Sequence, residues 1–420
     1  MANSLLTTAQ ITYECLDVLE NNLGFAGLVN RQYDSQFAET GGKIGATINV
    51  RKPPRYQVGT GPVIDPQATI DTYTPLTLTD QLNVSMAFSS ADLALNVDDF
   101  KERIINPAMA ALANQIDFLG AQRMYRAVGN LVGTAGQLTN QGTPPTSQQA
   151  ITAILAAGQK LDECATPMDI RNFVINPATN TGLVQAQSSI YQEITGYKGQ
   201  YEKGAVSAGI LGFNMVRDQN VVNHTYGSFT TGTVNGAQAA TNIAQSATDA
   251  PFALTVNALG GNITAGTSIT IAGVFNVNPQ SRQSTGALQN FVVTADAAAS
   301  ATTLNIWPYP VFSGPFQNCY SSSASIPNSA AIALIGSPTA STAYPMNIAF
   351  HKNAFTLATA DLPLPSGNGE AKRASSKSSG LSIRLVQGWY DARTDQFVSR
   401  IDCLMGWKAL YPELACKLQG

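Results

Sequence analysis

The sequence predicts an α+β protein into which an antiparallel, β-barrel-like domain is inserted. Three observations lead to this fold class. A long helical pattern covers residues 97–129, alternating apolar residues mark extended runs on both sides of it, and residues 225–350 are almost free of charge. The charged residues of that block are Asp249, Arg282 and Asp296, whereas the rest of the chain carries charge at ordinary density.

The low overall charge limits the kinds of molecule that the protein surface can attract. Charged residues make up 12% of the 420 residues, about half of the usual share in a soluble domain. Neutral polar side chains must therefore form much of the surface, or neighbouring molecules must cover it. The formal net charge of −3 gives no general attraction to nucleic acid or to acidic membranes.

Residues 4–24 have the pattern of an amphipathic helix that ends at Asn22 to Gly24. A helix of this kind either docks on the body of the protein or reaches toward a partner. One face is predicted to hold Ile11, Cys15, Val18 and Leu19, and the other Glu14, Asp17 and Glu20.

Residues 33–88 are extended in character and predict a long two-stranded arm. The first run, KIGATINVRKPPRY, breaks at Pro53-Pro54, and the second, TYTPLTLTDQLNVSMAF, has apolar residues in period-two order. Such an arm is not stable alone, so it has to lie against something. The basic residues of its first strand are Lys43, Arg51, Lys52 and Arg55.

The helix at 97–129 has a capping signal at each of two places. Asp98 and Asp99 suit the first turn, where carboxylates meet the positive helix end. Asn106-Pro107 is itself a typical helix start, so the segment is either kinked there or formed by two helices in tandem.

Residues 147–215 predict an α/β segment, with RNFVIN as a strand between two helices. The charge-poor block follows. Its central run is predicted to point Ile269, Ile271, Phe275 and Val277 inward, with Gly273 as a bend or bulge. Strands are predicted in the block at 252–256, 268–277, 290–294, 303–307 and 331–335.

Charge returns after Tyr344-Pro345, which makes the block an insertion rather than a terminal domain. The C-terminal run predicts a meander of two or three strands that turns at DARTDQ. Before it, GNGEAKRASSKSSG predicts a solvated flexible loop, because no aromatic residues that could stack on bases accompany its cations. These cations are Lys372, Arg373 and Lys377.

No catalytic, metal or cofactor motif emerges from the chain. His224 and His351 stand far apart without neighbouring carboxylate or cysteine motifs, and His351 is predicted to be structural or at the surface. The odd number of scattered cysteines argues against a disulfide framework or a zinc site and suits a reducing cytoplasm. The N-terminus lacks the pattern of a secretory signal, and no apolar run is long enough to cross a membrane.

The C-terminal part contains AFHKNAF, an aromatic-Asp turn in GWYDARTDQ, an R-x-D-x-x-x-G pattern at residues 400–406 and the sequence YPELA. With the preceding order of arm, hairpin, long helix and α/β segment, these motifs resemble the major capsid proteins of tailed double-stranded DNA bacteriophages with the HK97-like fold. The run ITIAGVFNVNP in an inserted β block resembles the P22-like coat proteins, which carry an extra insertion domain.

The resemblance implies five parts. These are an N-terminal arm (1–32), an extended loop (33–83), a peripheral domain with the long helix (84–135, completed by parts of 350–420), an axial domain (136–222, completed by parts of 346–420) and an inserted β domain (223–345).

The resemblance also implies a function. The chain would assemble as hexamers and pentamers into an icosahedral shell, first a procapsid and then a mature head, around the phage genome in the host bacterial cytoplasm. The implied partners are other copies of the chain, a scaffolding protein, a portal, a decoration protein and the packaged double-stranded DNA, with no membrane and no cofactor. Candidate contacts between subunits are Lys43, Arg51, Lys52, Arg55 and Arg282, and candidate contacts to a basic scaffold segment are Glu14, Asp17 and Glu20.

Three alternatives remain open from the sequence. An encapsulin-like cellular compartment has the same fold but is disfavoured by the insertion. A β-rich adhesin fits the Thr- and Asn-rich block but not the lack of a signal peptide. An enzyme comes last, because no catalytic residues were found.

Overall fold

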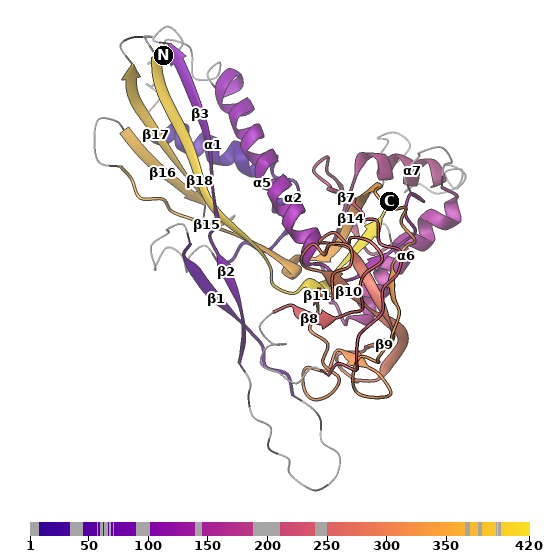
Figure 1. Cartoon of the computed structure of the whole chain (residues 1–420). Helices are drawn as coiled ribbons and strands as arrows, with labels where there is room; N and C mark the ends of the chain where they lie inside the picture. Colours follow the sequence, from indigo (N-terminus) through magenta and orange to yellow (C-terminus); the bar gives the residue numbers. More distant parts are fainter. Residues whose placement is uncertain are drawn as a thin grey trace. The chain divides into compact units, whose positions relative to one another are not determined.

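The computed structural model describes residues 8–33, 45–56, 71–89, 101–138, 145–187, 211–239, 250–365, 370–376, 380–391 and 396–420, with a few single residues between them (Figure 1). The chain forms two compact units. Unit 1 contains Met1–Asn49, Pro75–Ala121 and Phe355–Lys408, and unit 2 contains Val50–Thr74, Gln122–Ala354 and Ala409–Gly420. The five-part division expected from the sequence stays a prediction.

Unit 1 is built on a sheet with the strand order β15-β18-β17-β16, in which β3 (Asp80–Ser89) also pairs with β18. β17 (Leu381–Asp391) and β18 (Gln396–Ala409) pair as antiparallel strands of the predicted meander, and part of the predicted turn DARTDQ lies outside the described residues. The carboxylate of Asp402 in β18 is fully buried and accepts bonds of 2.6 Å from Arg384 and from Arg400. β15 covers Phe355–Ala360.

Helix α1 (Thr8–Asn22) packs on β16 and β17, so the N-terminal helix docks on unit 1. As predicted, Ile11, Cys15 and Leu19 are buried; Val18 is half-buried. The short helix α2 (Phe25–Leu28) follows.

Strand β16 (Glu370–Ser376) corrects the prediction of a flexible loop that contained Lys372, Arg373 and Lys377. All seven residues of β16 pair with β17, and α1 packs over the strand. Backbone pairing and the burial of Ala374 therefore outweigh the weak strand propensity of EAKRASS. Lys377 lies outside the described residues.

The predicted break at Asn106-Pro107 is confirmed. A π-helical turn at Lys101–Ile105 leads into α5 (Asn106–Ala127), whose Met109, Leu112 and Ile116 are buried. Asp98 and Asp99 lie outside the described residues. One side chain of α5 binds the segment around α2: Asp117 accepts bonds from the backbone N–H groups of Gly24 and Ala26.

The predicted two-stranded arm is shorter than expected. β1 (Thr47–Lys52) and β2 (Thr72–Thr77) form a two-stranded sheet, but the rest of the second extended run is β3, which joins β18. The period-two pattern is correct, since Leu76 and Leu78 are fully buried. The period-two pattern does not specify the strand with which each half of the run pairs.

Unit 2 contains a mixed sheet in the order β4-β19-β14-β5-β6, with β7 (Asn223–Thr225) on β14. β19 (Ala415–Gln419) belongs to this sheet and not to the meander of unit 1. Helices α6 (Ser147–Glu163) and α7 (Pro177–Gln187) accompany it, and Thr146 and Gln149 form a reciprocal capping box at the start of α6. The other strands are β4 (Leu131–Val132), β14 (Ala343–His351), β5 (Arg171–Ile175) and β6 (Asn214–Arg217).

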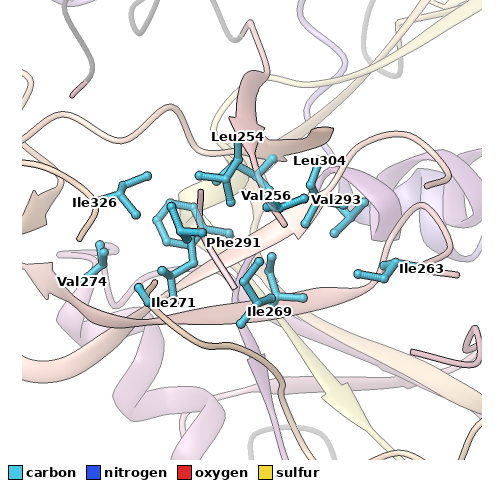
Figure 2. Close-up of a cluster of buried hydrophobic side chains, with 14 of the residues drawn as sticks. Leu254, Val256, Ile263, Ile269, Ile271, Val274, Phe291, Val293, Leu304 and Ile326 are labelled. Carbon is cyan, nitrogen blue, oxygen red and sulfur yellow. The ribbon is translucent and has the colours of Figure 1, made fainter. Parts of the chain in front are cut away.

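The charge-poor block forms a six-stranded antiparallel sheet in the order β12-β9-β10-β11-β8, with β13 on β9. The five predicted strands are present within a few residues. Their apolar side chains meet in one core around Phe291 (Figure 2). The strands are β8 (Phe252–Thr255), β9 (Ser268–Val277), β10 (Ser284–Val293), β11 (Thr303–Trp307), β12 (Cys319–Tyr320) and β13 (Ile332–Leu334).

One inward residue of β9 was predicted wrongly. Ile269, Ile271 and Val277 are buried, but Val274 is fully buried in place of Phe275, which is half-exposed. Gly273 has a φ of 78°, and the register of β9 with β10 shifts between Thr270 and Phe275. The predicted bulge is therefore present, and it reverses the side-chain parity after Gly273.

Candidate assembly surfaces

A cleft of about 500 Å³ in unit 2 brings together three of the five predicted intersubunit cations. Its wall contains Lys52 and Arg55 from the arm, Arg282 from the β9–β10 loop, and Glu413 from the segment before β19. These residues come from distant parts of the sequence, and the fold places them around one space.

Arg282 bonds two backbone carbonyls across this cleft. Its Nη1 donates to Gly314 O at 2.6 Å and its Nη2 to Tyr56 O at 2.9 Å. Arg282 itself has a φ of 58°, in the left-handed region. The side chain therefore joins the block to the segment that follows β1.

The two arm cations have partners in the C-terminal segment. Arg55 Nη2 lies 3.4 Å from Glu413 Oε1, and Lys52 Nζ lies 5.4 Å from the ring centre of Tyr411. Both contacts are with partly exposed groups and are weak individually. Arg51 is exposed on β1, and Lys43 lies outside the described residues.

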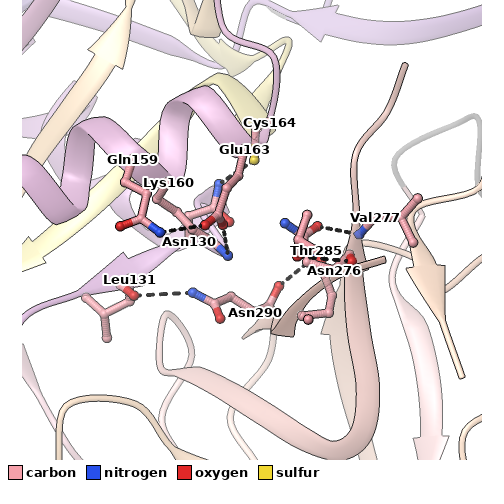
Figure 3. A network of polar contacts seen from close by, with 12 residues as sticks. Asn130, Leu131, Gln159, Lys160, Glu163, Cys164, Asn276, Val277, Thr285 and Asn290 are labelled. Atoms are coloured by element: carbon pink, nitrogen blue, oxygen red, sulfur yellow. Dashed lines mark hydrogen bonds and ion pairs between the residues drawn. The ribbon is translucent and has the colours of Figure 1, made fainter. Parts of the chain in front are cut away.

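Buried amides form another part of the cleft wall (Figure 3). Asn276 is 6% exposed; its Oδ1 accepts the Val277 N–H at 2.9 Å, and its Nδ2 has no hydrogen-bond partner. Asn290 Nδ2 donates to Leu131 O at 3.2 Å, and Asn130 Nδ2 donates to Ala415 O at 3.1 Å. The sequence reading missed these amides, although a polar residue at the centre of VFNVNP was a visible signal.

The acidic residues of α1 differ in exposure. Asp17 is exposed, while Glu14 and Glu20 are half-buried. Burial lowers the pKa of Arg31, and the nearby carboxylate of Glu20 opposes this shift. Of the three candidates for scaffold contact, Asp17 is the most accessible.

A buried polar junction, which the sequence reading also missed, holds the loop before β9. Lys417 Nζ donates to Gly266 O at 2.8 Å, and His224 Nε2 shares a bond of 3.0 Å with Thr267 Oγ1. The Tyr125 hydroxyl lies 3.4 Å from His224 Nδ1. Side chains from α5, β7 and β19 thus meet at one loop of the block.

Both titratable groups of this junction are shifted toward their neutral forms. Burial lowers the pKa of Lys417 to about 7. Burial, followed by the positive charges of Lys417 and Arg126, lowers the pKa of His224 to about 4. His224 is therefore a neutral structural histidine at physiological pH.

The part of the chain that the structure describes contains no cluster of three metal-ligating side chains and no helix able to span a membrane. The five cysteines are free, and burial raises the pKa of Cys416 to about 12. His351 is buried, and its Nδ1 accepts a bond of 3.3 Å from the Asn353 N–H. The ring of His351 and the thiols of all the cysteines except Cys164 are therefore buried in the protein.

A family model described as P22 coat protein, gene protein 5, matches residues 1–420. The chain belongs to the P22 coat protein family. It is a structural shell protein that associates with further copies of itself. The family assignment confirms the resemblance deduced from the C-terminal motifs and the inserted run, and it does not favour the encapsulin alternative.

Several solved structures are similar to the chain at low identity. A chain of Mycobacterium phage Che8 has 13% identity and a TM-score of 0.47, with 100% of this chain and 95% of that chain covered. A virus-like particle from Pyrococcus furiosus has 9% identity and a TM-score of 0.39, with 97% of each chain covered. The CUS-3 coat protein I-domain has 25% identity and a TM-score of 0.19, with 26% of this chain and 98% of that chain covered. No curated protein sequence matches the chain.

Proposed function

We propose that the chain forms the icosahedral shell that encloses the double-stranded DNA genome of a tailed phage, as a procapsid that becomes a mature head. The observation that carries this proposal is the match of the P22 coat protein family along all 420 residues. In this proposal the chain has the HK97-like fold, residues 223–345 are an inserted β-barrel-like domain, and hexamers and pentamers assemble in the host bacterial cytoplasm.

Two physical features support a shell. The two-stranded arm of β1 and β2 buries too little to be stable alone, so contacts with a neighbouring subunit would stabilise it. The low charge of the chain suits surfaces that neighbours cover, because charged residues are depleted from the centres of interfaces.

Electron microscopy of the protein expressed with and without its neighbouring genes tests this function. We expect large, uniform shells in the presence of the scaffolding and portal genes, and nuclease-resistant DNA in particles isolated from infected cells. A stable monodisperse monomer under every condition would reject the shell. Shells that hold a protein cargo in place of DNA would support the encapsulin alternative.

The proposed scaffold contact is a separate test. A basic scaffold segment would meet the acidic face of α1, where Asp17 is exposed. We expect Asp17→Lys to reduce scaffold-dependent assembly more than Tyr13→Ala, a change at an exposed aromatic residue of the same helix. Unaltered scaffold-dependent assembly after reversal of Glu14, Asp17 and Glu20 would contradict the contact.

A further inference from the structure

We propose that the cleft lined by Lys52, Arg55 and Arg282 receives a carboxylate-bearing segment of a second copy of this chain during assembly. This inference rests on the proposed shell and names a site at which two subunits meet. The occupant is an acidic peptide segment, and its carboxylate is the group that the cleft recognises.

The charge of the cleft is the first argument. Among its described lining residues, three cations face a single carboxylate, that of Glu413. Arg282 donates to two neutral carbonyls, and no described carboxylate lies within ion-pair distance of it. A carboxylate at this point would gain charge-assisted hydrogen bonds in a partly desolvated place.

The unpartnered donor in the cleft wall is the second argument. Asn276 is more than nine-tenths buried, and its Nδ2 bonds no other group. A buried donor without a hydrogen-bond partner destabilises the fold. An incoming carboxylate or backbone carbonyl oxygen would satisfy it.

The mixture of amides and rings favours a peptide over an inorganic ion. Gln289 and Asn290 also line the cleft, and side-chain amides carry both donors and acceptors that match a peptide backbone. Tyr56, Trp307 and Phe316 add apolar surface that a phosphate ion would not use. Glu413 would also repel a polyanion such as nucleic acid more than it would repel a single carboxylate.

The inferred partner is a second copy of this chain. A coat protein assembles with itself, so copies are present at high local concentration. The sequence has 27 acidic against 24 basic residues. Exposed carboxylates such as Glu102 are therefore present on a neighbour.

Cross-linking in assembled shells tests the site directly. Shells are formed from a mixture of ¹⁵N-labelled and unlabelled full-length chains and treated with a carbodiimide, which joins amines to carboxylates in direct contact. We expect peptides that join Lys52 of one isotope to an acidic residue of the other in shells and not in monomers. Links of Lys52 that stay within one chain would overturn the proposal.

Two substitutions give an independent measure. Asn276→Asp places a carboxylate in the cleft with almost no change in volume, and Arg282→Gln removes its unmatched charge. We expect each to raise the critical concentration for assembly about tenfold, which corresponds to about 1.4 kcal/mol per contact. The matched control is Arg373→Gln, which removes an exposed cation of β16 and should leave the critical concentration unchanged.

Folding is checked separately by urea unfolding of the monomers. A second variant, Lys52→Met, keeps the apolar stem over Tyr411 and changes only the charge, so it covers the case in which Arg282→Gln unfolds the block. Equal critical concentrations for the wild type, Asn276→Asp and Lys52→Met would overturn the site while leaving the shell intact. If the wild type never assembles, the proposed function itself fails. If an oligonucleotide protects Lys52 in the shell from the carbodiimide, nucleic acid and not a subunit occupies the cleft.

Discussion

The sheet of unit 1 and the charge-poor block of unit 2 differ in their polar contacts. In unit 1, Asp402 is fully buried and holds Arg384 and Arg400. In the block, neutral amides replace such ion pairs. Asn318 Oδ1 accepts the Val311 N–H at 2.8 Å while its Nδ2 donates to Tyr309 O at 2.8 Å.

The same pattern recurs elsewhere in the block. Gln238 bonds both the N–H and the carbonyl of Thr255, at 2.9 and 2.6 Å, as a neighbouring strand would. Asn262 Oδ1 accepts the Ser228 N–H at 2.9 Å. These polar side chains therefore form hydrogen bonds with the backbone of the block itself. This explains how the block can be rich in polar residues and yet almost uncharged.

At a fixed pH near 7, the largest loss of stability from one substitution is expected at the buried carboxylate of unit 1. Asp402→Ala leaves Arg384 and Arg400 close together without their common partner. We expect the free energy of unfolding to fall by about 3 kcal/mol, near the lower end for a broken buried pair because Arg400 is partly exposed. Urea unfolding followed by the fluorescence of Trp407, in the same unit, measures it.

Glu370→Ala is the control for Asp402. Its pair with Lys372 spans 3.9 Å at the surface of the same sheet, so the expected loss is below about 0.5 kcal/mol. Equal losses for the two variants would contradict the special role of the buried carboxylate.

The second effect concerns Lys417, the buried lysine that binds Gly266 O in unit 2. The folded pKa of Lys417, about 7, lies below the ordinary value of 10.5. Between these values the unfolded chain binds the proton more strongly, so the free energy of unfolding rises with pH by up to about 1.4 kcal/mol per pH unit. We expect Lys417→Met to abolish this rise, as measured by urea unfolding at several pH values.

His224 gives a separate slope at acid pH. Its pKa is lowered from 6.5 to about 4, so stability falls as the pH is lowered through this window. Burial is the largest cause of this shift, so the slope should persist in Lys417→Met, but it should be smaller because the charge of Lys417 also contributes to the shift. A wild-type protein whose stability is independent of pH between 7 and about 8.5, below the ordinary pKa of the cysteine thiols, would contradict the buried lysine.

The smallest effect is expected for a neutral amide of the block. Asn318→Ala removes two bonds to the backbone and should cost about 2 kcal/mol. Because no charge is involved, the loss should be the same at low and high salt, in contrast to a surface ion pair. Ser322→Ala, at an exposed site in the following loop, is the control, and a strong salt dependence of the Asn318→Ala loss would contradict the comparison.

The sequence predicted those helices and strands whose hydrophobic period and end signals lie within the element itself. The strand at 268–277 and the helix from Ser147 to Glu163 have the correct period and clear ends. The helix break at Asn106 follows from the chemistry of proline. Lys52 and Arg55 were recognisable as basic residues of one extended run, and Arg282 as the one basic residue of the charge-poor block.

The missed features depend on partners that are distant in sequence. β16 is a strand because β17 and α1 cover it, and β19 joins β14 because of the fold of unit 2. Tyr56 and Arg282 are 226 residues apart, so their shared cleft has no local signal. Lys417 is the exception among these missed features, because a lysine inside the apolar run LACKL is visible in the sequence.

The pairing of β3 with β18 has a consequence for synthesis on the ribosome. Gln81 and Asp402, which meet in that pairing, are 321 residues apart. At about 5–20 residues per second, translation leaves β3 without its partner for roughly 16–64 s. The strands of the charge-poor block all lie within residues 252–334 and can close early. In a nascent chain the β block can therefore be folded while β3 is still unpaired. Chaperones have their longest opportunity to bind at the unpaired edge of β3.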